Sequence, residues 1–425
     1  MKVLFLSANT ERLVEPVLPL GAALVAAAAR RAGHQVFFLD LMTRADPWRD
    51  TVETLETFRP DVIGLSVRNI DDQEMRSARF LLEPVRDLVS LLRRYSRAPI
   101  VLGGAGYSIY PESALAYLGA DFGIQGEGEA AFPLLLTRLE TGLVLDGTPG
   151  LFRAAGQESS GPRSYETNLD LFSLDRDLDG LAAALDEEQI WFPYQTRRGC
   201  PMDCSYCSTA SIEGRRLRKR TPELAVREIR GLAEKGIRRF QFVDNTFNIP
   251  EPYALRLCRE LAPLGEEISW RCIFYPWRVS EDLVKAMAKA GCKEVTLGFE
   301  SGSEPILRAM NKRYRPADVR ETSRLFEDHG IHRLGMILLG GPGETLASVE
   351  QTLVFADSLD CELVAVTAGI RIYPSTRLAD VARAEGVIRP DDDLLHPRFY
   401  LARGLEVRLP ELLEAWTRDR PNWLM

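Results

Sequence analysis

The chain has 425 residues and a formal net charge of −8, from 53 Lys and Arg against 61 Asp and Glu. This length predicts two or three domains, and the acidic balance argues against nucleic-acid binding. The apolar fraction of 45% is that of a folded chain and excludes intrinsic disorder. No stretch approaches the roughly 20 unbroken apolar residues of a membrane span, and the N-terminus lacks the pattern of a signal peptide. We therefore expect a soluble, cytoplasmic protein.

Residues 1–142 alternate short apolar runs with helical periods. The runs VLFLS, QVFFLD, DVIGLSV, PIVLGG and DFGIQG begin at residues 3, 35, 61, 99 and 121, and helical periods fall near 20–33, 47–58, 73–95 and 111–118. Strands separated by helices of this length predict a parallel, doubly wound sheet. In such a sheet ligands bind beyond the carboxyl ends of the strands.

Small and polar residues follow these predicted strands. They are Ser7-Ala8-Asn9, Ser66-Val67-Arg68-Asn69, Gly103-Gly104-Ala105-Gly106 and Gly126-Glu127-Gly128-Glu129. Glycines at strand ends allow a large flat ligand to approach the backbone, but tight turns between strand and helix also need glycine. These residues alone leave both interpretations open.

The periodicity fades over residues 143–185, where Gly, Ser and Pro predict a linker. A second series of strands and helices follows over 186–386, and residues 387–425 form a C-terminal tail. Its predicted strands are 190–198, 239–244, 268–275, 294–300, 333–340 and 363–373. Six repeats without a Rossmann-type glycine signature predict an α/β barrel or partial barrel.

Three of the seven cysteines, Cys200, Cys204 and Cys207, lie within eight residues after the first predicted barrel strand. Three thiolates on one loop can bind three irons of a [4Fe–4S] cluster and leave the fourth iron open. An open iron can chelate the amino and carboxylate groups of S-adenosylmethionine (SAM). A structural zinc site is the alternative, but it requires four protein ligands, and no histidine lies near the triplet. The other four cysteines stand among apolar residues and are expected in the core.

With this motif the sequence resembles the cobalamin-binding branch of the radical SAM enzymes over most of its length. The resemblance rests on LPLGAALVAAAARRAGHQVFFLD, SVRNIDD, GGAGYSIYPE and GIQGEGEAAFPLLL in the first part, and on FVDNTFN, GFESGS, LGGPGET and RIYPSTRL in the second. It implies an N-terminal Rossmann-like, doubly wound cobalamin-binding domain over 1–142 and a partial (β/α)6 radical SAM barrel over 186–386. The last motif departs from the family pattern, because Ser375-Thr376 replaces the usual Gly-Thr.

The resemblance implies three cofactors, a [4Fe–4S] cluster, SAM and cobalamin. It assigns SAM contacts to Tyr206, Asp244, Asn245, Glu300, Ser301, Gly340, Gly341 and Pro342. It assigns cobalamin contacts to Asn9, Leu20, Gly21, Ser66, Val67, Arg68, Asn69, Gly103, Gly104, Ala105, Gly106, Gln125, Gly126, Glu127 and Gly128. The loop after the first strand lacks the DxHxxG histidine that binds cobalt in other cobalamin domains, and His34 precedes the second strand. We therefore predict cobalamin without a protein histidine, with Arg68 or Asn69 facing the lower side of the corrin.

The function implied is that of a C-methyltransferase acting on an unactivated carbon. One SAM would methylate Co(I), and a second would be cleaved to a 5′-deoxyadenosyl radical. The substrate would be a small molecule or peptide of a biosynthetic pathway, and an external one-electron reductant of the flavodoxin or ferredoxin type would supply electrons. A non-methylating cyclase or rearrangement enzyme is the alternative. A cobalamin carrier or sensor would have no use for the three cysteines.

The basic run RRLRKR at residues 215–220 is a further feature of the second part. It is expected to form a solvated connection into the next helix. RNA binding is the alternative, which the acidic chain as a whole disfavours.

Overall fold

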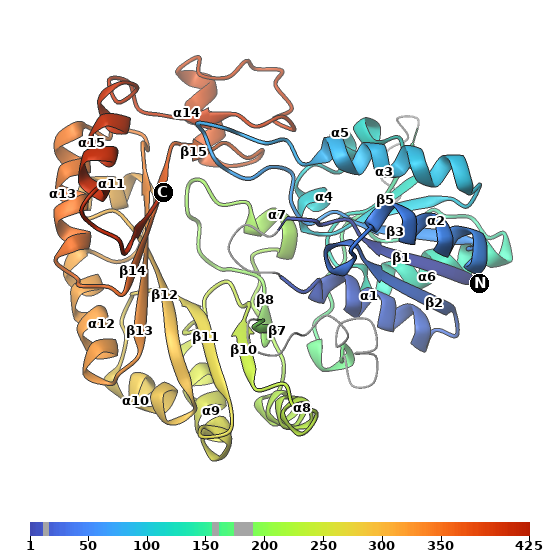
Figure 1. The fold of residues 1–425 in the computed structure, drawn as a ribbon, viewed down its shortest axis with the longest axis horizontal. Coiled ribbons are helices and arrows are strands. Elements are labelled where there is room, and N and C mark those ends of the chain that lie inside the picture. Colours follow the sequence, from blue (N-terminus) through green and yellow to red (C-terminus); the bar gives the residue numbers. More distant parts are fainter. Residues whose placement is uncertain (12–16, 155–160, 174–189) are drawn as a thin grey trace. The chain divides into compact units, whose positions relative to one another are not determined.

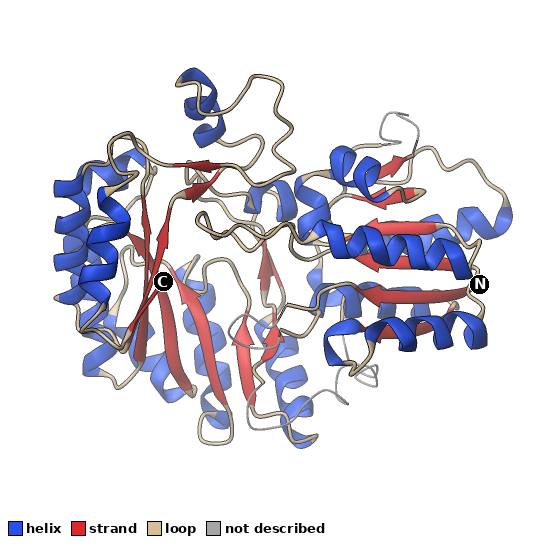
Figure 2. Cartoon of the chain, turned by 45° about the horizontal axis from the view of Figure 1, so that its top comes forward, coloured by secondary structure: helices blue, strands red, loops and turns tan. Residues whose placement is uncertain are grey.

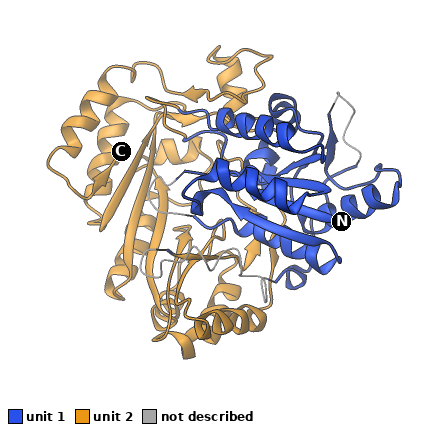
Figure 3. Ribbon diagram, turned by 45° about the vertical axis from the view of Figure 1, so that its right-hand side comes forward, with its two compact units in different colours: residues 1–72, 79–190, 209–214 blue, residues 73–78, 191–208, 215–425 orange. Residues whose placement is uncertain are grey.

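The computed structural model describes residues 1–11, 17–154, 161–173 and 190–425 (Figure 1). The chain divides into two compact units (Figure 3). Unit 1 comprises residues 1–72, 79–190 and 209–214, and unit 2 comprises residues 73–78, 191–208 and 215–425. Parts of the predicted linker, 155–160 and 174–185, lie outside the described residues.

Unit 1 contains a six-stranded sheet in the order β2-β1-β3-β4-β5-β6. Its strands are β1 Lys2–Ser7, β2 Gln35–Asp40, β3 Val62–Ser66, β4 Ile100–Gly103, β5 Phe122–Ile124 and β6 Leu151–Arg153. The first five pair in parallel, and β6 runs antiparallel to β5. The order of the parallel strands is that of a doubly wound, flavodoxin-like sheet, whose topological switch point lies between β1 and β3. The predicted fold class is confirmed, and β6 shows that part of the predicted linker extends this sheet.

The helices of unit 1 differ in how they begin. They are α1 Leu20–Arg31, α2 Pro47–Phe58, α3 Leu82–Tyr95, α4 Ala105–Ile109, α5 Pro111–Leu118, α6 Gly128–Thr141 and α7 Thr209–Glu213, with 3-10 turns at Leu41–Thr43 and Leu169–Leu171. For α2, the Asp46 carboxylate accepts from Arg49 N, and Pro47 takes the first helical position. The helix predicted over 73–95 begins only at Leu82. Gln73 has a φ of 59°, which a right-handed helix does not allow.

Unit 2 contains a parallel seven-stranded sheet in the order β17-β14-β13-β12-β11-β10-β7. Its strands are β7 Phe192–Tyr194, β10 Arg239–Phe242, β11 Ser269–Phe274, β12 Cys292–Glu300, β13 His332–Leu339, β14 Leu363–Ala368 and β17 Trp423–Leu424. All six predicted barrel strands are present, which confirms the partial barrel. The seventh, β17, comes from the C-terminal tail.

Helices cover the outer side of this sheet, as Figure 1 shows for α8, α9, α10, α12 and α13. The helices are α8 Pro222–Glu234, α9 Glu251–Leu261, α10 Glu281–Lys289, α11 Glu304–Ala309, α12 Pro316–Asp328, α13 Leu346–Asp357, α14 Arg377–Ala384 and α15 Arg408–Thr417, with a 3-10 turn at Ala262–Leu264. Two antiparallel pairs complete the unit, β8 Arg197–Arg198 with β9 Arg218–Lys219 and β15 Ile370–Arg371 with β16 Phe399–Tyr400 (Figure 2). No helix in the described ranges is long and apolar enough to cross a membrane.

Alternate side chains of the barrel strands enter a core under these helices. Phe242 lies 5.0 Å from Trp270 and 5.4 Å from Phe247, measured between ring centroids, and all three rings are fully buried. Side chains at the alternate strand positions point to the opposite face of the sheet. Two of them, Ile273 on β11 and Met336 on β13, keep about two fifths of their surface exposed. Because successive side chains of a strand point to opposite faces, the sheet has a buried outer face under the helices and an accessible inner face.

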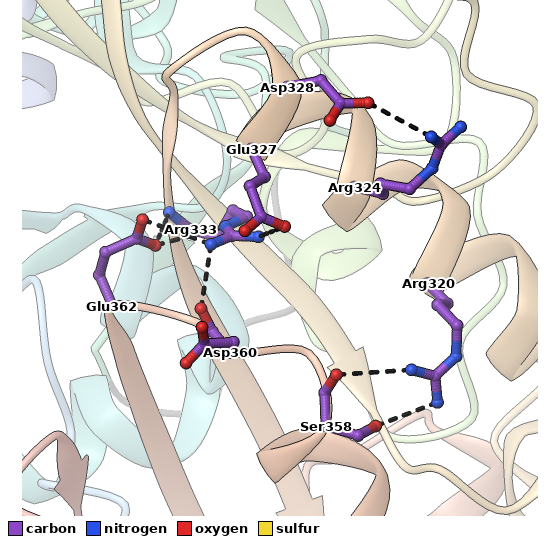
Figure 4. A network of polar contacts seen from close by, with 8 residues as sticks. All are labelled: Arg320, Arg324, Glu327, Asp328, Arg333, Ser358, Asp360 and Glu362. Carbon is purple, nitrogen blue, oxygen red and sulfur yellow. Dashed lines mark hydrogen bonds and ion pairs between the residues drawn. The ribbon is translucent and has the colours of Figure 1, made fainter.

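Charged side chains join the amino-terminal ends of β13 and β14 (Figure 4). The buried Arg333 guanidinium donates to a Glu327 carboxylate oxygen at 3.0 Å and to the Asp360 carbonyl at 2.9 Å, and it pairs with Glu362 at 3.4 Å. On the neighbouring α12, Arg320 contacts Ser358 at 3.0 Å. In barrels of this kind the amino-terminal face serves stability, and these pairs lie opposite the strand ends that carry the glycine and cysteine motifs.

Candidate functional site

The three cysteines lie on the loop between β8 and α7, and this loop is anchored at several points. Ser205 N donates to Met310 O at 3.1 Å, and Asn311 Nδ2 donates to Asp203 O at 2.6 Å. Arg215 and Arg377 each reach one carboxylate oxygen of Asp203 at 2.6 Å. The Arg215 hydrogen bond holds the pKa of Asp203 below its ordinary value. The loop is therefore shaped by the protein itself.

The donor set on this loop fits a [4Fe–4S] cluster. Cys200 is buried, Cys204 is half-buried and Cys207 is exposed, while the remaining four cysteines lie buried in the core, as predicted. Among the described residues no three His, Cys, Asp or Glu side chains form a group suited to a single metal ion. A cluster binds each thiolate through a different iron, so its ligands need not converge on one point.

Glu300, at the end of β12, is directed toward the cysteine loop by an irregular backbone. Its φ is 62°, and the register of β12 against β13 shifts between Gly298 and Glu300. Left-handed backbone in a non-glycine residue is costly, and bulges re-aim side chains near active sites. The Tyr206 hydroxyl donates to Glu300 Oε1 at 2.8 Å, and Lys312 Nζ donates to the same oxygen at 3.0 Å. The structure thus brings together Tyr206 and Glu300, and it adds Lys312, which the sequence analysis missed.

Two other predicted SAM-binding residues have partners inside the fold. Fully buried Asp244 accepts from Thr196 N at 2.8 Å, Thr196 Oγ1 at 2.5 Å and Arg197 N at 2.9 Å. The buried Ser301 hydroxyl lies 2.9 Å from Thr352 Oγ1 and accepts from the backbone two residues further on. Both side chains hold loops at the strand ends, and their direct contact with SAM stays a prediction. The same is true of half-buried Asn245, which follows Asp244.

The glycine-rich turn after β13 is held by a carboxyl group. Glu344 Oε2 accepts from the backbone of Gly340 and, at 3.0 Å, from that of Gly341. Gly340 has a φ of 98°, which favours glycine, and Pro342 is half-buried. Glu344 Oε1 is buried without a hydrogen-bond partner among the described residues, and burial raises the pKa of Glu344 to about 7. The sequence analysis quoted this motif but missed Glu344, an acid four residues after the glycine that leaves the strand.

The basic run at 215–220 is not a uniformly solvated segment. Arg218 and Arg220 are 4% and 7% exposed. Arg220 pairs at 3.4 Å with Glu228, which also accepts from the Tyr194 hydroxyl at 2.6 Å. The prediction of a solvated connection is therefore wrong for these two residues, because a carboxylate on α8 draws Arg220 into the fold.

In unit 1 the carboxyl ends of β3, β4 and β5 form one surface. Val67 N donates to Gly103 O at 2.8 Å, and Gly106 N donates to Val67 O at 3.1 Å. Gly104 has a φ of 98°, and a Cβ there would lie 2.5 Å from Val67 O. The buried Ser108 hydroxyl donates to Gly104 O at 2.8 Å and accepts from Gly126 N at 2.9 Å. The predicted cobalamin loops are thus tied together, partly through Ser108, which the sequence analysis did not single out.

The remaining predicted cobalamin-binding residues lie just after strands or at the first positions of helices in unit 1. Arg68 is exposed and Asn69 is half-buried, while no described heavy atom lies within 4 Å of the position a Gly21 Cβ would take. Asn9 follows β1, Leu20 and Gly21 open α1, Ser66 ends β3, Ala105 opens α4, Gln125 and Glu127 follow β5, and Gly128 opens α6. His34 lies at the opposite end of the sheet, 3.4 Å from the N-terminal amino group. Bare backbone and an exposed cation fit a large, flat, polar cofactor.

Comparisons with known proteins agree with both halves of this description. The B12 binding domain family matches residues 7–136, and the radical SAM superfamily matches residues 194–356. An uncharacterised methyltransferase of Pyrococcus horikoshii is 28% identical over 91% of this chain and 84% of its own. The tryptophan 2-C-methyltransferase of Streptomyces laurentii is 25% identical over 87% and 73%. A solved structure of the radical SAM methyltransferase TsrM from Kitasatospora setae, with cobalamin and a [4Fe–4S] cluster bound, has a TM-score of 0.88 and 22% identity, covering 100% of this chain and 92% of that one.

A doubly wound cobalamin-binding unit followed by a partial barrel with a CxxxCxxC loop defines a class of enzyme. Residues 7–136 belong to the B12 binding domain family and residues 194–356 to the radical SAM superfamily, so the chain is a cobalamin-binding radical SAM enzyme. Its cofactors are those of the two families, cobalamin for the first and SAM with a [4Fe–4S] cluster for the second.

Proposed function

We propose that this enzyme is a C-methyltransferase that methylates an unactivated carbon of a small-molecule substrate. The observation that carries the proposal is the anchored three-cysteine loop with Glu300 directed at it, in a chain that also has a cobalamin domain. The two relatives named above are methyltransferases, and this chain aligns with most of their length. This similarity supports methyl transfer. When bound, SAM supplies both a methyl group and a 5′-deoxyadenosyl radical, and cobalamin carries the methyl group to the substrate.

The residues of the barrel position these groups. Cys200, Cys204 and Cys207 hold the cluster, and the carboxylate of Glu300 offers an acceptor to the SAM amino or ribose groups. The turn at Gly340-Gly341 presents backbone without side chains to the adenine. An external one-electron reductant of the flavodoxin or ferredoxin type delivers the electron. Cys207 is the exposed cysteine of the loop, so we expect the electron to enter near it.

The residues of unit 1 bind the corrin. The tied loops after β3, β4 and β5 support its ring, and Arg68 or Asn69 faces its lower side. His34 is the one histidine in the sequence of unit 1, and it lies at the far end of the sheet. No histidine of this unit would therefore bind cobalt, and cobalt without such a ligand would transfer a methyl group more readily.

The test follows methyl transfer without requiring the substrate. Anaerobically reconstituted protein, loaded with hydroxocobalamin and reduced with Ti(III) citrate, is given SAM labelled in its methyl group. We expect one label per bound corrin and an equal amount of S-adenosylhomocysteine. In the matched control, Cys200→Ala/Cys204→Ala/Cys207→Ala, labelling of the corrin persists while 5′-deoxyadenosine formation disappears. Deoxyadenosine from the parent protein without any labelled corrin would favour the alternative, a cyclase or rearrangement enzyme.

A further inference from the structure

Lys312 is a buried cation beside the cysteine loop. It follows α11, and its side chain is 5% exposed. Its ammonium lies 5.2 Å from the ring centroid of Tyr206 and 5.9 Å from those of Tyr275 and Tyr314. Burying a cation is costly unless it is paired. Here the Glu300 carboxylate pairs with it at 3.0 Å, and the ring faces add cation–π attraction.

The rings around Lys312 are themselves held by the backbone. The Tyr314 hydroxyl donates to Gly298 O at 2.9 Å, and the Tyr275 hydroxyl accepts from Arg313 N at 3.0 Å. The ammonium therefore sits in a preformed aromatic enclosure at the end of β12, which restricts its movement.

Lys312 also lies against the cysteine loop. Tyr206, whose ring faces the ammonium at 5.2 Å, stands between Cys204 and Cys207 in the sequence. The Tyr206 hydroxyl and the Lys312 ammonium donate to the same oxygen of Glu300, at 2.8 and 3.0 Å. The ammonium is therefore a buried positive charge next to the segment that carries the cluster thiols.

We propose that Lys312 is a positioning residue whose buried charge beside the cysteine loop raises the reduction potential of the cluster and which holds Glu300 in place. Reduction adds one electron from the external reductant to the cluster and forms no bond, so the reduced cluster carries one more negative charge. A nearby cation favours that state. The inference depends on the cluster but not on methyl transfer.

The Glu300 charge opposes that of Lys312, so the cleanest comparison removes the lysine where the carboxylate is already neutral. The chosen pair is Glu300→Gln and Glu300→Gln/Lys312→Met. In this background Lys312→Met removes a positive charge beside the cysteine loop that no Glu300 carboxylate compensates. We expect the ratio of reduced to oxidised cluster at a set potential to fall about tenfold, which is about 59 mV for one electron.

The experiment is a redox titration of the anaerobically reconstituted full chain without SAM, followed by electron paramagnetic resonance. Lys312→Met alone should also lower the potential, and adding Glu300→Gln to it should reverse part of that fall. Lys293→Met is the matched control. Lys293 is exposed at the other end of β12, about 20 Å from Glu300 at the rise per residue of a strand, so salt screens its charge from the cluster. It should leave the potential unchanged.

Equal potentials for Glu300→Gln and Glu300→Gln/Lys312→Met would overturn the inference. So would a failure of every Lys312 variant to bind iron while Lys293→Met and Glu300→Gln bind it, since that would make Lys312 a requirement for assembly. If the parent protein binds iron but no label reaches the corrin, the proposed methylation is wrong. The redox titration would still decide the role of Lys312 in that case.

Discussion

Glu344→Gln should remove a pH dependence from the stability of unit 2. One carboxylate oxygen of Glu344 holds Gly340 and Gly341, and the other is buried without a partner among the described residues. Burial raises the pKa of Glu344 from an ordinary 4.5 to about 7, so the folded chain favours the protonated acid. Glutamine has the shape of that acid and never ionises.

The size of the effect follows from linkage between protonation and folding. A folded-state pKa above the unfolded value means that the stabilisation is fully present below pH 4.5 and is lost as the pH rises through about 7. At about 1.4 kcal/mol for each pH unit, the parent chain loses ~3 kcal/mol that the variant keeps. The buried amide nitrogen of the variant has a cost that is the same at every pH, so the slope is the quantity to compare.

The assay is urea unfolding at pH 5, 6.5 and 8, followed by tryptophan fluorescence. Five of the six tryptophans belong to unit 2, so this signal reports mainly on the barrel. Relative to the parent, Glu344→Gln should gain ~3 kcal/mol between pH 5 and pH 8. Glu350→Gln, at an exposed position on α13, the helix that follows Glu344, should gain nothing. Parallel pH profiles for the parent and Glu344→Gln would refute the reasoning.

Three further predictions concern the cluster, the core and the cobalamin surface. The parent chain should bind about four irons after anaerobic reconstitution, and replacing Cys200, Cys204 and Cys207 by Ala should abolish iron binding in elemental analysis; one zinc and no iron in anaerobically purified parent protein would contradict the cluster. Phe242→Ala removes a fully buried ring from the barrel core and should cost ~3–5 kcal/mol in urea unfolding; a loss below about 1 kcal/mol would show that the cavity collapses. Ser108→Ala breaks the link between two cobalamin loops and should weaken hydroxocobalamin binding about tenfold in equilibrium dialysis, given ~1–3 kcal/mol for unsatisfied buried partners; unchanged affinity would place the corrin elsewhere.

Local patterns in the sequence determined the elements and the cluster loop. Each barrel strand was predicted because a buried strand needs a short apolar run, and the cysteine spacing places three thiols on one loop whatever surrounds it. The start of α3 and the pairing of β17 could not be predicted in this way. The first depends on the left-handed backbone of Gln73, and the second on a partner strand, β14, about 60 residues earlier in the chain.

The roles of polar residues at strand ends were decided by tertiary contacts. Asp244 and Glu300 look alike in the sequence, since each is a carboxylate at the end of a barrel strand. The structure buries Asp244 among the donors of Thr196, whereas the bulge before Glu300 turns that side chain to Tyr206 and Lys312. A short sequence window shows that such a group is present, but its partners lie up to 94 residues away. Only the folded chain, which brings these partners within hydrogen-bonding distance, determines which carboxylate faces the cysteine loop.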